Sequence, residues 1–437
     1  SVERTTRASG LARLEWWISP RSRFMLRAAA GRLTREFDGN GQALLSYGSQ
    51  LPEESTEFSV AGALTSEVER NMTLELRGGV SGSDRVFDGT VAGVPGATLV
   101  GTGTQLGSAL GDAAAKRLDF HLVPTLHYRL SSGTIKGGAL MRVSRHTASY
   151  ASAGAGSFLF DGANALDAGR GYLVSSNAPE SSFTASEFGG FLQYDWEAAP
   201  GLRLRMGGRV DYEAIARSEV DSVGAWYDRS GILNNDYPYE FVQFGGGTSF
   251  EWDVAGDGRS VVHGALSVHQ GNLDPSLVHE VFTHDGSVDV ARVAGVGVDW
   301  PGGTASSSFS ALPSLAILGP DTRAPQSSRV SLGLIQELSG GWGLYLGGAL
   351  RRTDFLTRRR NLNLAASANA LDAYERDVFG SLTKDGSLVT AEVGSNTRFL
   401  EFDDVWALDT DGYSEYRAVT VGLEHSSETA DFFASYT

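Results

Sequence analysis

Histidine and carboxylate side chains gather in one stretch of the chain, where they could hold a metal ion. His279, Glu280, His284 and Asp285 lie close together in the sequence. Imidazole nitrogens and carboxylate oxygens are common ligands of divalent metals. Their spacing matches no helical or tight-turn ligand motif, so ordinary polar loop residues are the favoured interpretation.

A second acidic stretch resembles an oxygen-ligand calcium loop. Asp403, Asp404, Asp409 and Asp411 are followed by Gly412. Acidic residues at alternate positions can present carboxylates to a hard cation, but the later glutamate of an EF-hand is out of register. A solvated acidic loop is favoured. The sequence predicts no cofactor and no metal, and it leaves four candidate ligands: His279, His284, Asp409 and Asp411.

One dense basic cluster consists of Arg351, Arg352, Arg358, Arg359 and Arg360. At the rim of a membrane protein it could hold lipopolysaccharide phosphates or an anionic ligand, because arginine binds phosphate in a bidentate fork. Pairing with acidic residues of neighbouring loops is the favoured interpretation.

No constellation of catalytic residues stands out. The chain has no cysteine, no H-E-x-x-H and no G-x-S-x-G motif. The triple glycine Gly245–Gly247 lies in an alternating segment with no helix after it, so it is not a phosphate loop. We expect no enzyme. The alternative is a barrel enzyme that carries Ser, His and Asp on its wall.

Composition narrows the class of protein further. The chain has 437 residues, 55 of them glycine, and a formal net charge of -16 from 52 acidic and 36 basic side chains. The absence of cysteine excludes disulfide frameworks, and the acidic balance argues against a nucleic-acid partner. The chain contains no run of about 18 apolar residues, so we predict no transmembrane helix. The first residues lack the apolar core of a secretory signal, as expected of a mature or truncated chain.

The elements that position these side chains show a period of two. From Leu202 to Tyr212 apolar residues alternate with arginine and aspartate. Successive side chains of a strand point to opposite faces, so one face is apolar and the other is charged. Neither a soluble core nor a two-layer sandwich readily accepts the charged face, whereas the wet lumen of a membrane barrel does. The predicted lumen charges are Arg77, Asp119, His121, His127, Arg129, Arg203, Arg205, Arg209 and Asp211. A network of paired charges is favoured for them over direct contact with a substrate.

The alternation predicts about fourteen strands in seven hairpins. Short turns alternate with long stretches rich in Gly, Ser, Asp and Asn, which is typical of outer-membrane barrels with short periplasmic turns and long extracellular loops. The predicted strands are 11–18, 24–32, 58–64, 72–80, 118–130, 135–145, 188–196, 202–212, 244–254, 261–269, 330–338, 342–352, 419–425 and 432–437.

Tryptophans lie beside three of the short turns. Trp196, Trp252 and Trp342 fall on the apolar face, as an interfacial girdle requires. Packing into a soluble core is the alternative. Pro124 cannot donate to a strand ladder, so we predict a bulge at this position.

Several segments resemble the barrel of TonB-dependent outer-membrane receptors, particularly the Oar-like group. One is FGGFLQYDWEAAPGLRLRMGGRVDYE at 188–213, an aromatic strand, a Pro-Gly turn and a returning G-x-R-x-D-Y-like strand. Others are 325–363, which contains RRRNLN, and GYSEYRAVTVGL at 412–423, followed by the terminal FFASYT. The resemblance covers most strands and little of the long loops.

The resemblance implies an all-β transmembrane antiparallel barrel of twenty-two strands with an N-terminal plug and a short motif that binds TonB. Neither plug nor motif is found in this chain, and the chain stops at Thr437 inside a strand instead of at a terminal aromatic residue. We therefore expect residues 1–437 to be a fragment of the barrel region. A complete smaller porin is the alternative, because fourteen is an allowed strand number.

The implied function is TonB-dependent uptake of an unidentified extracellular ligand across the outer membrane of a Gram-negative-type bacterium. The implied partners are outer-membrane lipid and lipopolysaccharide, the ligand, and the TonB complex through a plug outside this chain. The rival interpretations are a passive porin-like channel and a structural or adhesive surface barrel. The sequence does not identify the ligand, although the Oar-like resemblance favours oligomeric nutrients or peptides over siderophores.

Overall fold

The computed structural model describes most of the chain. The described residues are 2–38, 53–87, 96–99, 104–106, 111–152, 157–160, 169–176, 180–216, 220–236, 240–294, 311–319, 321–364, 381–382, 388–389, 398–427 and 430–437. Among them, no helix is long and apolar enough to cross a membrane.

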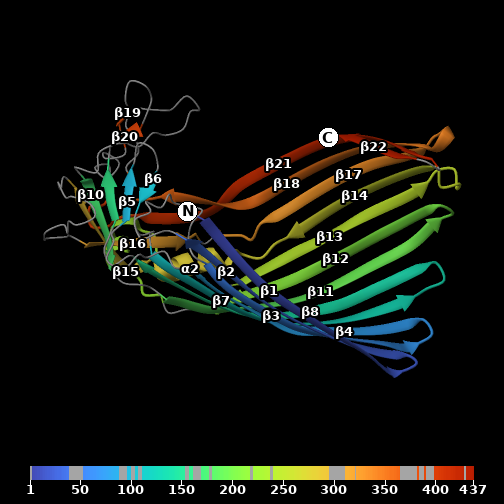
Figure 1. Ribbon diagram of the computed structural model, residues 1–437, viewed down its shortest axis with the longest axis horizontal. Helices are drawn as coiled ribbons and strands as arrows, with labels where there is room; N and C mark the ends of the chain where they lie inside the picture. The colour runs from blue at the N-terminus through green and yellow to red at the C-terminus, as the bar shows by residue number, and fades with distance from the viewer. Residues whose placement is uncertain are drawn as a thin grey trace.

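The main sheet has twenty strands, of which fourteen form one continuous wall; we call these the long strands, although β22, at the edge, has only six residues. Each long strand pairs with the next in an antiparallel ladder, and the sheet bends into a deep trough (Figure 1). The predicted all-β barrel fold is confirmed, and all fourteen predicted strands are present. The long strands are β1 (Val2–Ser19), β2 (Ser22–Asp38), β3 (Glu53–Glu69), β4 (Met72–Phe87), β7 (Gly111–Arg129), β8 (Gly133–Ser152), β11 (Glu180–Ala199), β12 (Leu202–Ile215), β13 (Glu240–Asp253), β14 (Ser260–Gln270), β17 (Gln326–Glu337), β18 (Trp342–Asn361), β21 (Val405–Ser426) and β22 (Asp431–Tyr436).

The remaining elements gather at the end opposite the short turns (Figure 1). They are β5 (Gly96–Leu99), β6 (Thr104–Leu106), β9 (Ser157–Phe160), β10 (Gly169–Ser176), β15 (Asp285–Ala294), β16 (Ala311–Leu318), the separate pair β19 (Ser381–Leu382) and β20 (Leu388–Val389), and the helices α1 (Gly224–Ser230) and α2 (Pro275–Thr283). A 3₁₀ turn, η1 (Ser339–Gly341), joins β17 to β18. Most long strands exceed the ~10 residues that cross a bilayer, so the wall projects beyond the membrane on the long-loop side.

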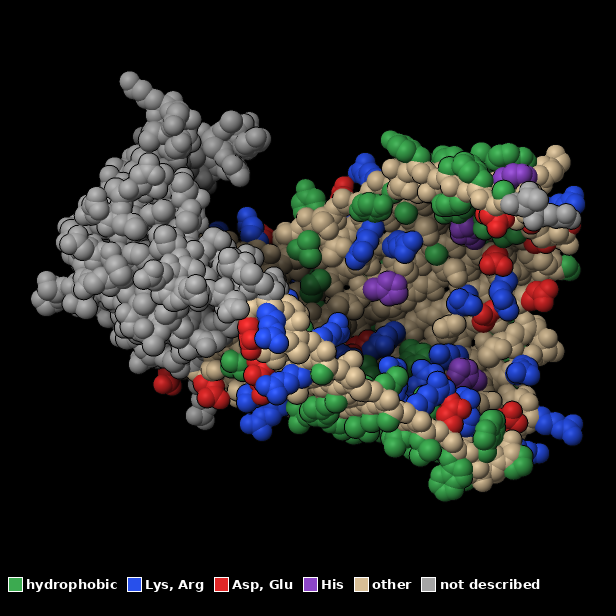
Figure 2. All heavy atoms as spheres, in the orientation of Figure 1, with side chains coloured by type: hydrophobic (Ala, Val, Ile, Leu, Met, Phe, Trp, Pro, Cys, Tyr) green, Lys and Arg blue, Asp and Glu red, His purple; other side chains and the backbone are tan. Residues whose placement is uncertain are grey.

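The sheet does not close on itself within the described residues. β1 pairs with β2 and β22 pairs with β21, and no described strand pairs with the outer edge of either. The trough therefore has two free edges, and it opens toward the viewer in Figure 2.

The two faces of the sheet differ as the alternation predicted. Apolar side chains are exposed on the convex face, where Leu192 is 61% exposed and Val210 is 47% exposed. Figure 2 shows these apolar side chains along the outside and the charged ones in the hollow. Exposed apolar surface of this extent is what lipid contact requires.

The predicted bulge at Pro124 is wrong. The β4–β7 ladder runs through Leu76 and Pro124 without a shift of register. On the other side, Leu122 pairs with Met141 and Thr125 with Gly138, which is the same register of β7 on β8. Pro124 removes one backbone donor, and the pairing of β7 with β8 skips Val123 and Pro124 without a change of register.

Candidate functional site

The predicted lumen charges all lie on the inward face of the wall. Strand register places them together with Glu75, Arg117, Arg142, Glu187 and Asp195, which the sequence prediction did not include. Arg203 and Arg205 both reach Asp195, at 3.2 and 2.9 Å. Arg77 pairs with Glu75 at 2.6 Å, and His127 lies 3.8 Å from the same carboxylate. Within the described residues, His121 and Arg129 make no ion pair.

Glu187 on β11 is the centre of the most buried group of charges. Its side chain is 9% exposed and accepts from Arg142 and Arg209, each at 3.1 Å. Arg209 also pairs with Asp211. Asn272, which lies after β14, donates to Glu187 at 3.2 Å. Burying a carboxylate is costly unless it is well paired and hydrogen-bonded, as this one is.

Helix α2 lies over this group at the mouth of the trough. Asp274 caps its first turn by accepting from the Ser276 amide at 2.9 Å, and Pro275 occupies the first helical position. Both residue types favour a helix start. The apolar side chains Leu277, Val278, Val281 and Phe282 then fall on one side of the helix.

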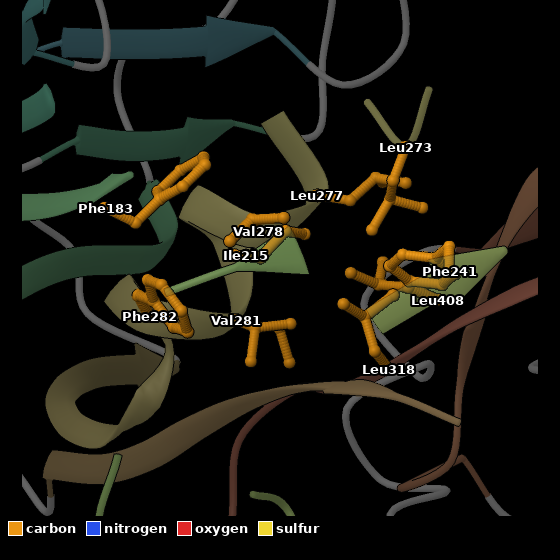
Figure 3. Packing of buried hydrophobic residues seen from close by; sticks show 11 residues of the cluster. Phe183, Ile215, Phe241, Leu273, Leu277, Val278, Val281, Phe282, Leu318 and Leu408 are labelled. Atoms are coloured by element: carbon orange, nitrogen blue, oxygen red, sulfur yellow. The ribbon is translucent and has the colours of Figure 1, made fainter. Parts of the chain in front are cut away.

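That apolar side of α2 packs against the inward face of the wall (Figure 3). Phe183, Ile215 and Phe241 from three wall strands meet Val278 and Val281 of the helix, and Val281 is fully buried. Leu318 of β16 and Leu408 of β21 complete the cluster. The outer end of the lumen is thus partly closed by a dry core, which we call the α2 cap (residues 273–283 and the wall residues they contact).

Polar contacts also join the α2 cap to the wall. The ring of His279 shares a hydrogen bond with the Ser181 hydroxyl and packs against Phe183. Burial lowers the pKa of His279 to about 4, with a smaller effect of nearby His146. Burial also raises the pKa of Glu280, although its ion pair with Arg359 opposes this. The neutral ring of His279 suits its place beside the dry core.

Two hollows lie beside the Glu187 group. A cavity of about 240 Å³ lies under the α2 cap and includes His146 and Glu213. Glu213 accepts from Gln243 at 3.0 Å and from the Leu273 amide at 3.4 Å, which ties the cap to the wall. A larger hollow of about 830 Å³ follows the inner wall from Glu187 across glycines of β12 and β13 to Ser267 and His269. These hollows can accept a polar solute, and the wall groups around them are mostly paired.

The candidate metal ligands do not come together. His279 faces Ser181, and His284 turns back to its own helix, near the Glu280 carbonyl oxygen. Asp409 and Asp411 are held by Arg360 and Arg358, at 3.0 and 2.5 Å. Among the described residues, no three His, Cys, Asp or Glu side chains form a group that could hold a metal.

The basic cluster divides into separate surfaces. Its strand register shifts near Phe355, the one described non-glycine residue with positive φ. Before the shift, Arg351 faces inward, whereas Arg352 lies on the opposite face with Asp354 and Glu415. After the shift, Arg358 and Arg360 bind the two aspartates, and Arg359 binds Glu280 of α2 at 2.5 Å. The five arginines therefore do not form one site.

The three predicted girdle tryptophans lie at the short-turn end of the outward face. Trp252 opposes Leu202 in the ladder, Trp196 stacks on Tyr194, and Trp342 stacks on His425. Trp252 is 44% exposed. Trp16 of β1, next to the first short turn, occupies an equivalent place that the sequence prediction missed.

The sequence did contain signals for the missed elements. Asp-Pro-Ser at 274–276 before apolar residues at helical spacing indicates a capped helix start. If the predicted strand 188–196 had been extended to include residue 187, the alternation would have placed Glu187 on the same inward face as Arg142. Which carboxylate meets which arginine, however, depends on strand register and cannot be read from one sequence.

The fold just described matches a known class of protein. The profile of the outer membrane β-barrel domain family matches residues 1–437, the whole length of the chain. The chain belongs to this family. An outer membrane β-barrel domain places the wall in the outer membrane of Gram-negative bacteria.

Solved structures that this barrel domain resembles are outer-membrane transporters and receptors, not enzymes. One is the outer membrane transporter YddB from Escherichia coli, with a TM-score of 0.59 and 9% identity, over 97% of this chain and 46% of that one. Another is the copper transporter OprC, with a TM-score of 0.57 and 12% identity, over 99% of this chain and 52% of that one. A third is the siderophore receptor PirA from Acinetobacter baumannii, with a TM-score of 0.56 and 8% identity, over 98% of this chain and 51% of that one.

At these identities the likeness concerns the fold, and it confirms the predicted resemblance to the barrel of TonB-dependent receptors. The chain spans about half the length of these structures. Comparison with the sequences of curated proteins finds no match.

Proposed function

We propose that this barrel domain is part of the wall of a TonB-dependent transporter that takes up a ligand across the outer membrane. The observation that carries the proposal is the inward face, where paired charges such as the buried Glu187 with the partly exposed Arg142 and Arg209 line an open hollow. A wall built this way is polar and rigid. It suits a lumen through which a polar ligand moves past a second protein layer.

The two free edges support a wall with more strands. Unpaired backbone N–H and C=O groups along β1 and β22 are too costly to leave in lipid. We therefore propose that residues 1–437 form one part of a larger barrel, with further strands and a plug supplied by the rest of the same protein. A closed passive porin of only these strands is disfavoured, because β1 and β22 do not pair.

Uptake in living cells tests the energy source. We expect a strain lacking the gene to lose uptake of a nutrient from a panel of labelled ferric chelates, copper complexes, peptides and oligosaccharides. Deleting tonB, or adding a protonophore, should abolish the same uptake. Gene-dependent uptake that persists without TonB would identify a passive channel instead. Gene-dependent surface adhesion with no uptake would identify an adhesive barrel.

A further inference from the structure

Two arginines of the inner wall face each other, and the described part of the chain places no counter-charge beside them. Arg329 of β17 and Arg351 of β18 are direct partners in the antiparallel ladder, so their side chains emerge side by side on the lumen face. Like charges directly opposite each other on one face destabilise a sheet. Both side chains are exposed.

The surroundings of this pair are neutral and hydroxylic. Arg351 donates to the Ser327 hydroxyl at 2.9 Å, and Thr353 lies 3.3 Å from the same oxygen. Ser267 opposes Arg329 on the next strand. Within the described residues, neither guanidinium has a carboxylate within ion-pairing distance.

The arginine pair on β12 differs from Arg329 and Arg351 in having a counter-charge. Arg203 and Arg205 lie on the same inward face, two positions apart, and share the carboxylate of Asp195. There the chain supplies an acid between the two arginines. At Arg329 and Arg351 that place is open, and donors converge on it.

We propose that Arg329 and Arg351 form an oxyanion-binding site on the lumen wall, which takes the phosphate, sulfate or carboxylate group of a solute. Two guanidinium forks bind an oxyanion through several parallel hydrogen bonds. The Ser327 and Thr353 hydroxyls and the nearby His269 ring, whose residue opposes Ser327 in the ladder, add further hydrogen-bond donors.

The place of the pair in the wall suits a site on a path. The 830 Å³ hollow begins at Ser267 and His269, which adjoin Arg329, and runs to the Glu187 group under the α2 cap. Figure 2 shows that basic and histidine side chains are present in the hollow of the trough. An anionic ligand lying in the hollow can set its acidic group between the arginines. This inference deepens the proposed transport function, because it names the charge class of the ligand.

Calorimetric titration of the purified full-length protein with inorganic phosphate tests the site, at constant ionic strength and against a chloride blank. We expect saturable binding that weakens at least about tenfold in the double variant Arg329→Gln/Arg351→Gln, because charge-assisted hydrogen bonds are lost. The matched control Arg203→Gln/Arg205→Gln removes the same charge from the same face. It should bind phosphate within about twofold of wild type, because its arginines are already paired.

Thermal unfolding without phosphate separates binding from folding. Removing two facing like charges should leave the melting temperature of the double variant equal to or above that of wild type. Phosphate binding that is unchanged in the double variant would overturn the proposal, and so would wild-type protein that shows no saturable heat. If the wild-type protein shows no saturable heat and the double variant melts at a lower temperature, the two arginines instead bind a carboxylate of the protein itself. Neither readout involves TonB, so failure here is distinguishable from failure of the energised uptake.

Discussion

At the scale of single residues, the wall depends on a few buried charges with several partners each. Glu187 accepts from two arginines and one asparagine, and it is nearly inaccessible to solvent. Such a buried carboxylate contributes more than an exposed ion pair, since several hydrogen bonds to one charged, desolvated group are lost with it.

Replacing Glu187 with glutamine should therefore destabilise the barrel by about 2 kcal/mol, because buried hydrogen bonds to a charged group are weakened. Equilibrium unfolding by urea in detergent micelles measures this. Arg77→Gln breaks an exposed pair on the same face, and it should change the stability by less than about 0.5 kcal/mol. Equal effects of the two substitutions would show that the Glu187 group is not specially stabilising.

The burial of His279 gives the α2 cap a pH dependence. The pKa of this histidine is about 4 in the folded cap, below its ordinary value of 6.5. A released cap therefore takes up a proton near pH 6.5 while the docked cap resists it. The contribution of His279 to the docking free energy is complete above about pH 6.5 and is lost as the pH falls toward 4.

Hydrogen exchange of the α2 amides, corrected for intrinsic rates, should show protection that falls on the order of tenfold between pH 7 and pH 5. The raised pKa of Glu280 gives a slope of opposite sign, so the variant His279→Asn isolates the contribution of His279. We expect the fall in protection to disappear in that variant. An unchanged fall would assign the titration to another group.

At the scale of elements, α2 is held to the wall by packing and not by the ladder. Val281 is completely buried between the helix and the wall. We predict that Val281→Ala weakens α2 docking by about 2 kcal/mol, through lost contacts and a cavity.

Hydrogen exchange of α2 should record this loss while the urea transition of the barrel stays in place, because the ladder does not depend on the helix. Ser276→Ala, on the exposed side of the first turn, serves as the control and should leave α2 protected. Loss of barrel stability together with α2 protection would show that the cap and the wall fold as one unit.

Strands and helices differed in how well the sequence predicted them. Alternation identified all fourteen long strands, because lipid and water act on opposite faces of the same strand and leave a period of two. It gave no information on α2, whose capping signal at Asp274 and Pro275 lies inside a long Gly- and Ser-rich stretch. The ends of the strands beyond the membrane were also missed, because past the bilayer the outward face no longer has to be apolar.

The candidate site was predictable as a face but not as a set of contacts. The sequence placed Arg203, Arg205 and Asp211 toward the lumen, yet it grouped Arg351 with rim arginines that belong to other surfaces. The five arginines are divided among several surfaces because the strand register shifts near Phe355, and the alternation of apolar and polar residues does not predict such a shift. The opposed pair Arg329 and Arg351 likewise exists only through the β17–β18 register.

At the scale of the whole molecule, the free edges of β1 and β22 make closure a testable matter. We predict that β1 and β22 are separated by other strands in the intact protein. A cysteine pair at Glu15 and Ser435 should therefore fail to cross-link in the outer membrane. Cysteines at Ala12 and Ala28, which are ladder partners in β1 and β2, should cross-link readily. Cross-linking of the first pair would indicate a small closed barrel and favour a passive channel.

The most direct test of the wall itself is a single-cysteine accessibility scan along β12 in whole outer membranes, which is clean because the chain has no cysteine. We predict that cysteines at 203, 205 and 209 react with a water-soluble maleimide, whereas those at 204, 206 and 210 react only with a lipid-soluble one. Reaction of both sets with the water-soluble reagent, or a pattern with the faces reversed, would contradict a wall whose charged face lines the lumen and whose apolar face meets lipid.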